Sequence, residues 1–246
     1  MIWRRHRGST PALPPAQLAT SWQLISLLLD YPDRALRERL PLLRTGSAGL
    51  PPSVGWPLLE VIDWLDSTDP AAAQAAYVDT FDVTRRCALH LTYYTCGDTR
   101  RRGAELIRIK QAYRRAGVEL ADAELPDHLS VVLEFGAAYD PNVAWKLLCD
   151  NRVGIELLHR SLGERSSPWA PVIDALRATL PPLAGTDEEA LARLIAEGVP
   201  TEAVGLDLAP YIMPGAAPAP PPGRQQLPLA PAGAASASGL RAGVFR

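Results

Sequence analysis

The sequence predicts an all-α fold, a single globular domain of roughly eight to ten helices. Apolar residues recur at three- and four-residue steps through most of the chain, which is the period of an amphipathic helix. Alternating apolar and polar residues occur only in short runs, and β-branched residues are few, so no convincing strand is predicted. Hydrophobic residues make up 47% of the chain, which is enough for a sizeable core.

Apolar stripes and prolines at helix starts define the first half of this fold. The stripes are Leu18, Trp22, Ile25 and Leu29, then Leu36 and Leu40, then Trp56, Leu59, Ile62 and Leu65. Asp69 is a favourable N-cap and Pro70 a favourable first residue for the helix that follows. Five tryptophans are expected in the core or between helices: Trp22, Trp56, Trp64, Trp145 and Trp169.

Caps and turn residues define the second half. Asp98 is a favourable N-cap for a helix over 99–116, and Gly117 is a favourable stop. One helix is expected to open at Pro141 and to run through residues 142–162. The other helices are marked by Leu129, Leu133 and Ala137, by Trp169, Val172, Leu176 and Leu180, and by the capping box of Thr186 and Glu189 that Gly198 and Pro200 close.

Composition divides the chain into four parts. Residues 1–16 are proline-rich and predict a flexible N-terminal segment, residues 17–200 form the helical domain, and residues 201–213 are expected to be extended. In residues 214–246, Ala, Pro, Gly and Ser account for 23 of 33 positions. Such a segment buries too little apolar surface to offset its ordering entropy, so we predict a disordered tail.

Charge, cysteine content and hydropathy exclude several classes of protein. The net charge of −2 argues against a nucleic-acid-binding protein, and no run of 18 apolar residues predicts a membrane-spanning helix. Three cysteines without CxxC spacing indicate neither a disulfide framework nor a metal site, and the N-terminal residues lack the apolar stretch of a secretory signal. We therefore expect a cytoplasmic protein. No motif of a known class of enzyme is present.

Charge is unevenly distributed around the middle of the chain. Residues 84–117 carry nine basic and two acidic side chains, whereas residues 118–140 carry six acids and neither Lys nor Arg. Either the two segments fold side by side and neutralise each other, or they present a bipolar surface to a ligand. The three arginines 100–102 stand at a predicted helix N-terminus, where cations are unfavourable. Asp79, Asp82 or an anionic partner is expected to offset them.

Two motifs in this region resemble a known family. The stretch "YVDTFDVTRRCALHLTYYTCGDTRRRG", Tyr77 to Gly103, resembles the signature of the NarJ-type chaperones, which belong to the TorD/DmsD-like group of redox-enzyme maturation proteins. "ELPDHL", Glu124 to Leu129, resembles the second hallmark of that group, and "VVLEF", Val131 to Phe135, also fits. Both motifs occur in the order and at the separation of the family, which makes the resemblance specific.

The resemblance implies a TorD-like helical chaperone without catalytic activity. Such a protein binds the N-terminal peptide of the catalytic (alpha) subunit of nitrate reductase in the cytoplasm. It holds the apo-enzyme while bis-molybdopterin guanine dinucleotide and an iron–sulfur cluster are inserted, before the enzyme docks onto the membrane. The resemblance implies no stably bound cofactor in the chaperone, and neither nucleic-acid binding nor direct membrane insertion. A chaperone for a different molybdoenzyme and, from the arginines of 84–117, a helical nucleic-acid-binding protein are the alternatives.

Charged and phenolic side chains in the two motifs are the candidate peptide-binding residues. An amphipathic peptide helix needs an apolar groove with polar edges, and tyrosine supplies an apolar ring with a polar tip. The candidates are Tyr93, Tyr94, Asp98, Arg101, Arg102, Glu124, Asp127, His128 and Glu134. Asp127 is also a favourable acid for the start of its own helix, and His128 either packs or makes binding pH-dependent. No metal site is predicted, because the spacing offers no set of three or four ligands.

Overall fold

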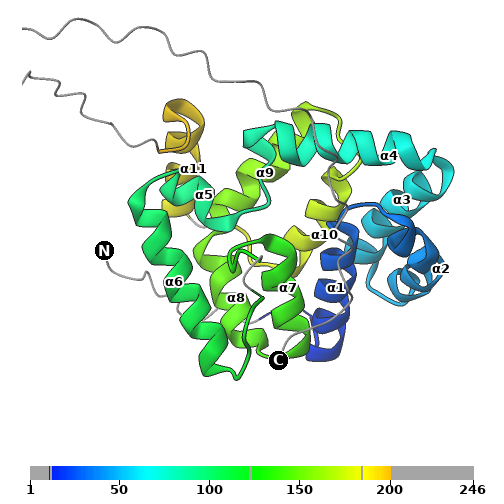
Figure 1. The fold of residues 1–246 in the computed structure, drawn as a ribbon, viewed down its shortest axis with the longest axis horizontal. Helices are drawn as coiled ribbons and strands as arrows, with labels where there is room; N and C mark the ends of the chain where they lie inside the picture. The colour runs from blue at the N-terminus through cyan, green and yellow to red at the C-terminus, as the bar shows by residue number, and fades with distance from the viewer. Residues whose placement is uncertain (1–10, 12, 122–123, 184, 201–246) are drawn as a thin grey trace, which may run out of the picture. The chain divides into compact units, whose positions relative to one another are not determined.

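The chain forms a stack of packed helices in a computed structural model that describes residue 11 and residues 13–121, 124–183 and 185–200 (Figure 1). These residues contain eleven α-helices and no strand, which confirms the predicted all-α fold. The helices are α1 (Pro15–Leu28), α2 (Arg34–Ala48), α3 (Pro52–Ser67), α4 (Pro70–Tyr77), α5 (Leu91–Cys96), α6 (Arg100–Arg115), α7 (Leu129–Ala138), α8 (Pro141–Asp150), α9 (Arg152–Glu164), α10 (Ala170–Thr179) and α11 (Gly185–Glu197). A π-helix, η1 (Val78–Val83), and a 3-10 turn, η2 (Arg85–Cys87), join α4 to α5.

Most of the predicted four-part division stays a prediction. Segments 201–213 and 214–246, and most of segment 1–16, lie outside the described residues. Within the part of the chain that the structure describes, no helix is long and apolar enough to cross a bilayer.

Side-chain caps start several helices where the sequence predicts them. The carboxylate of Asp69 accepts hydrogen bonds from two backbone N–H groups in the first turn of α4, and Pro70 is the first residue of that helix. Asp140 does the same for α8, which Pro141 opens as predicted. The single helix predicted over 142–162 is wrong, because the chain turns at Asn151 and continues as α9.

The prediction that Asp98 caps the following helix is also wrong. Thr99 is the N-cap residue of α6, and its side chain makes no capping hydrogen bond. The carboxylate of Asp98 lies instead 3.6 Å from the guanidinium of Arg102, one turn into the helix. Gly117, with a φ of 80°, ends the same helix as predicted.

The core forms where α1 meets α7 and α10 (Figure 1). Trp22 of α1 is fully buried, and its indole N–H donates to the hydroxyl of Thr179, 3.1 Å away, at the end of α10. Gly136 lets α7 approach α8 and α1 closely, because a Cβ there would lie 2.4 Å from the Cβ of Ala144 and 2.7 Å from the Trp22 ring. Four of the five tryptophans pack in or against this core as predicted.

Trp56 is the exception, since 70% of it is exposed. The predicted stripe of α3 is right at Ile62 and Leu65, which are buried, and wrong at Trp56. The buried face of α3 is Val54, Gly55, Leu58, Val61, Ile62 and Leu65, and residue 56 falls outside it. Hydropathy alone places Trp56 on the apolar face of α3, but it does not show which face of the helix meets α2 and α10.

A buried group of charges joins α9 to α10. The carboxylate of Glu156 pairs with the guanidinium groups of Arg152, on its own helix, and of Arg177, on α10. Arg152 also donates to the carbonyl oxygen of Pro181, 3.1 Å away. Because both Arg152 and Glu156 are almost completely buried, each depends on the other for compensation. This group fixes the helix that forms one wall of the site below.

Candidate functional site

The two sequence motifs lie side by side in the fold. The backbone N–H of Leu91 donates to the carbonyl oxygen of Asp127 at 3.0 Å, and the N–H of Leu129 donates to that of Leu89 at 2.7 Å. These bonds make His90 and His128 partners in an isolated antiparallel bridge. The segment before α5 and the segment before α7 are therefore joined, although neither is a strand.

Asp127 is the centre of this junction. The residue is fully buried, and its Oδ2 accepts hydrogen bonds from the hydroxyl of Thr92 at 2.5 Å and from the Thr92 N–H at 3.3 Å. The Nδ1 of His90 lies 3.4 Å from its Oδ1, and the guanidinium of Arg102 lies 3.6 Å from its Oδ2. Burial alone would raise the pKa of Asp127, but His90, Thr92 and Arg102 together hold that pKa below its ordinary value.

The predicted role of Asp127 at the start of its own helix is wrong. Helix α7 begins at Leu129 with His128 as its N-cap residue, whereas the Asp127 carboxylate binds the first turn of α5 through Thr92. The acid thus serves a helix more than thirty residues earlier in the chain. A long-range contact of this kind ties the α5 motif to the α7 motif rigidly.

His128 lies against the second histidine of the junction. Its ring meets that of His90 edge to face, with centroids 5.2 Å apart. Burial lowers the pKa of His128 to about 4, and the neighbouring His90 adds to the effect against the opposing influence of Asp127. His128 is therefore neutral at neutral pH.

Tyr94 anchors α5 to α9 and is buried. Its hydroxyl lies 3.0 Å and 2.9 Å from the carbonyl oxygens of Arg86 and Ala88, to which it donates. Gly154 of α9 faces the ring, since a Cβ at that position would lie 3.0 Å from it. Burial raises the pKa of the Tyr94 phenol well above its ordinary value, so the hydroxyl stays a donor.

The nine candidate residues thus separate into three groups. Tyr94, Arg102, Asp127 and His128 form or flank the buried junction. Tyr93, Asp98 and Arg101 lie at the exposed or half-exposed turn between α5 and α6, which we call the motif surface. Glu124 and Glu134 form a partly exposed acidic pair near Asp30, where burial and repulsion from both neighbours raise the pKa of Glu134.

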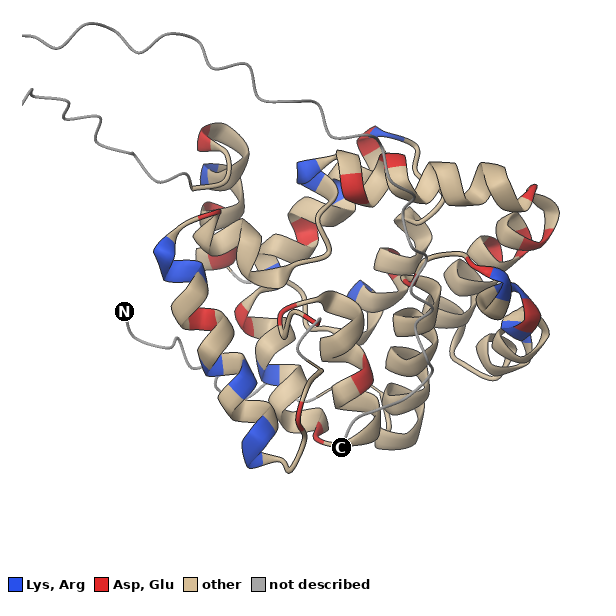
Figure 2. Ribbon diagram, in the orientation of Figure 1, with Lys and Arg blue, Asp and Glu red and all other residues tan. Residues whose placement is uncertain are grey.

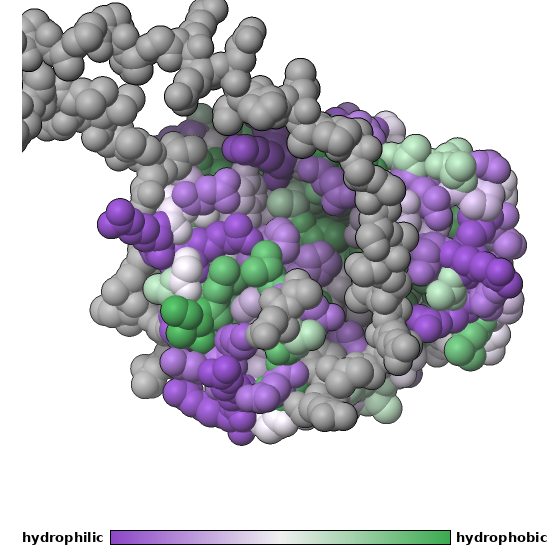
Figure 3. All heavy atoms as spheres, in the orientation of Figure 1, coloured by the Kyte–Doolittle hydropathy of each residue, from purple (hydrophilic) through white to green (hydrophobic). Residues whose placement is uncertain are grey.

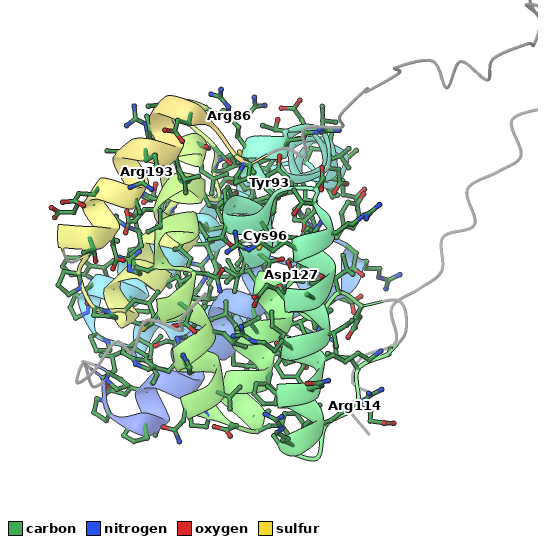
Figure 4. The ribbon with its side chains drawn as sticks, turned by 90° about the vertical axis from the view of Figure 1, so that its left-hand side faces the viewer. Arg86, Tyr93, Cys96, Arg114, Asp127 and Arg193 are labelled. Carbon is green, nitrogen blue, oxygen red and sulfur yellow. The ribbon has the colours of Figure 1, made fainter. Side chains whose placement is uncertain are left out.

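An apolar pocket lies beside the junction, but it is closed, because its lining leaves no room for a water molecule. Its lining comes from η2–α5, the start of α7 and α9: Ala88, Leu89, His90, Leu91, Tyr94, Leu129, Gly154, Ile155 and Leu158. The face drawn in Figure 3 also has a hollow with apolar side chains at its bottom. Figure 4 shows Tyr93, Cys96 and Asp127 on the side of the molecule where α5 and α6 lie next to each other.

Charges around the site follow the segments of the sequence. Lys and Arg are spread along α6 (Figure 2). Among the described residues, ion pairs that connect the basic segment with the acidic one include Arg102 with Asp127 and Arg114 with Glu119 at 3.9 Å. Asp79, which was expected to offset the arginines at 100–102, pairs with Arg165 at 2.5 Å instead.

Sequence reasoning missed His90, Thr92 and the α9 residues of the pocket. The α9 residues carry no local signal, because Ile155 and Leu158 read as ordinary apolar positions of a helix. Gly97 is a turn glycine at the end of α5. Its φ of 59° with a ψ of −159° is a conformation that essentially only glycine adopts.

Known proteins resemble this chain over the same region. Residues 47–175 match the family model described as "Nitrate reductase delta subunit". The nitrate reductase-like protein NarX of Mycobacterium tuberculosis is 40% identical over 159 residues, which are 64% of this chain and 24% of NarX, so the chain spans about a quarter of that relative's length.

Two further relatives are matched over a larger share of their own length. The nitrate reductase molybdenum cofactor assembly chaperone NarJ of Escherichia coli is 33% identical over 156 residues, 62% of this chain and 66% of NarJ. The crystal structure of a candidate redox enzyme maturation protein from Archaeoglobus fulgidus superposes with a TM-score of 0.50 and 25% identity, over 70% of this chain and 97% of that one.

Proposed function

Because this chain belongs to the nitrate reductase delta subunit family, with NarJ-type chaperones among its relatives, we propose that it is a maturation chaperone for a nitrate reductase. It binds the N-terminal peptide of the apo catalytic subunit in the cytoplasm. It holds that subunit while the molybdenum cofactor, bis-molybdopterin guanine dinucleotide, and an iron–sulfur cluster are inserted, and it performs no chemistry itself. The cofactor belongs to the client.

The observation that carries this proposal is the junction around Asp127. It joins the two signature motifs and leaves Asp98 and Arg101 exposed near the closed apolar pocket. Because the pocket is closed, it must open before an amphipathic client helix can insert aliphatic side chains and turn its polar face outward. The buried Asp127 and Thr92 and the half-buried His90 position the motif surface without contacting the client.

Charged edges on two sides set the direction of the bound helix. Arg101 on the motif surface favours an acidic residue of the client, and the pair of Glu124 and Glu134 favours a basic one. Release is part of the function, so the interface is expected to be of modest size, at or below roughly 1,600 Å² in total.

The function is tested by measuring the molybdenum content of the client. A strain that lacks this protein is complemented with the wild-type chain or with Arg101→Glu, and the catalytic subunit is purified. Because reversing an edge charge weakens docking, we expect Arg101→Glu to lower the molybdenum per subunit by about fivefold.

The matched control is Arg34→Glu, an arginine on α2 that is 92% exposed in its side chain and pairs with Glu38. It should restore wild-type molybdenum content. Full cofactor loading in the strain without any chaperone would contradict the proposed function.

A further inference from the structure

Helix α11 is attached more weakly than the helices around it. None of its residues is fully buried, whereas α9 and α10 each bury several. Its inner side is formed by the half-buried Leu191 and Leu194, and Ile195 on the other side is 43% exposed. A helix held by two half-buried leucines gains little from packing, so opening it costs little free energy.

The helix lies along α9, whose other side carries α5. Figure 4 shows α11, α9, α5 and α6 together on one side of the molecule. Near the start of α11, Asp187 approaches the thiol of Cys149 on α8, where burial and the carboxylates of Asp150 and Asp187 raise the thiol pKa to about 11. α11 therefore covers the helix that forms a wall of the apolar pocket.

The end of α11 rests on the signature motif itself. Gly198, with a φ of 80°, turns the chain, Val199 packs against the core, and the carbonyl oxygen of Pro200 lies against Gly97. A Cβ on Gly97 would lie 1.6 Å from that oxygen, so only glycine allows this contact. Gly97 is itself buried and directly precedes Asp98 of the motif surface. We call α11 with Val199 and Pro200 the cover.

We propose that the cover is a built-in competitor for the client, held on part of the surface that binds the client's leader helix and displaced from it when that helix arrives. This inference rests on the proposed function. Leu191 and Leu194 are three residues apart, the spacing with which an amphipathic helix presents one apolar face. A client helix with aliphatic side chains at that spacing fits the same surface of α9 on which α11 lies.

Competition inside the chain makes client binding reversible. The apparent association constant for a client is the intrinsic association constant multiplied by the fraction of molecules in which the cover is open. When the client leaves as its cofactor is inserted, the cover closes again on Gly97 and blocks immediate rebinding. The strength of the cover thus sets the apparent affinity for the client.

The test uses the full chain with the cover loosened. In the variant Leu191→Asp with Leu194→Asp, charges on the inner side of α11 release it, and Ile195→Asp puts the same charge on its exposed side as a control. The probe is a fluorescent synthetic peptide of residues 185–200 added in solution. Because the resident helix no longer competes, we expect the double variant to bind the probe at least about tenfold more tightly than the wild-type or Ile195→Asp chain.

The leader peptide of the client is then added to the bound probe. Displacement of the probe supports one shared surface. If the leader peptide binds the wild-type chain and the double variant equally and does not displace the probe, the inference is overturned and the proposed function stands. If neither peptide binds a folded chain, both are overturned.

A second measurement needs no variant. In the wild-type chain, amide hydrogen exchange in α11 is expected to be faster than in α9 and to rise further when the leader peptide is added. Unchanged or slower exchange in α11 on addition of the leader peptide would overturn the inference, even if the double variant does not fold.

Discussion

Replacing Asp127 with Ala is expected to lower the free energy of unfolding by about 3 kcal/mol, because it removes the acceptor of a buried network and leaves Arg102 with only the exposed carboxylate of Asp98. Arg102 has 19% of its side chain exposed and loses its buried partner, and the hydroxyl and N–H of Thr92 lose their acceptor. Urea unfolding followed by circular dichroism measures the change.

Asp98→Ala is the matched control for this prediction. Both carboxylates lie 3.6 Å from the same Arg102 guanidinium, but the side chain of Asp98 is 62% exposed and that of Asp127 is buried. We expect the loss of Asp98 to cost less than about 1 kcal/mol, as exposed ion pairs do. Equal effects of the two substitutions would show that the junction around Asp127 does not hold the motifs together.

Stability is expected to fall as the pH decreases from about 6.5 to about 4, and His128 is the cause. The folded pKa of His128 is about 4 and its ordinary value is 6.5. Between these values the unfolded chain takes up a proton that the folded chain does not, so acidification favours unfolding, by up to about 3 kcal/mol in all.

Two neighbouring carboxyl groups also change the stability, one of them below this pH range and the other in the opposite direction. The lowered pKa of Asp127 adds a further loss of stability only below its ordinary value of 3.8. The raised pKa of Glu134 acts in the opposite sense above 4.5, because the folded state there binds the extra proton. The slope between pH 6.5 and 4 is therefore a net effect in which His128 dominates.

The variant His128→Gln removes this titration. Its free energy of unfolding, measured by urea titration at a series of pH values, should be nearly flat where that of the wild-type chain falls. His159→Gln removes an imidazole that lies 2.8 Å from Asp174 on the far side of α9, and it should keep the slope. A slope that survives in His128→Gln would assign the pH dependence to other groups.

Local patterns made the fold predictable, because they depend on neighbours in the sequence. The caps Asp69 and Asp140, with the prolines after them, act on N–H groups two and three residues away. The same reasoning was wrong for Asp98 and Asp127, because distant partners competed for their carboxylates. Arg102 attracts Asp98, and the first turn of α5 attracts Asp127.

The site was predictable in its chain positions but not in its arrangement. The two motifs mark the right segments, and the structure brings them together. Which residues face outward depends on the packing of α5 against α9, where Gly154 makes room for the buried ring of Tyr94 and Tyr93 stays half-buried. Two adjacent tyrosines cannot be told apart by their sequence alone, since only tertiary contacts decide which of them is buried.

The most direct test of the central idea is a calorimetric titration of the folded full chain with the N-terminal peptide of the nitrate reductase catalytic subunit. Our account predicts saturable binding of one peptide per chain, weakened by Arg101→Glu and unchanged by Arg34→Glu. No binding by the folded wild-type chain, or equal binding by both variants and the wild-type chain, would contradict it.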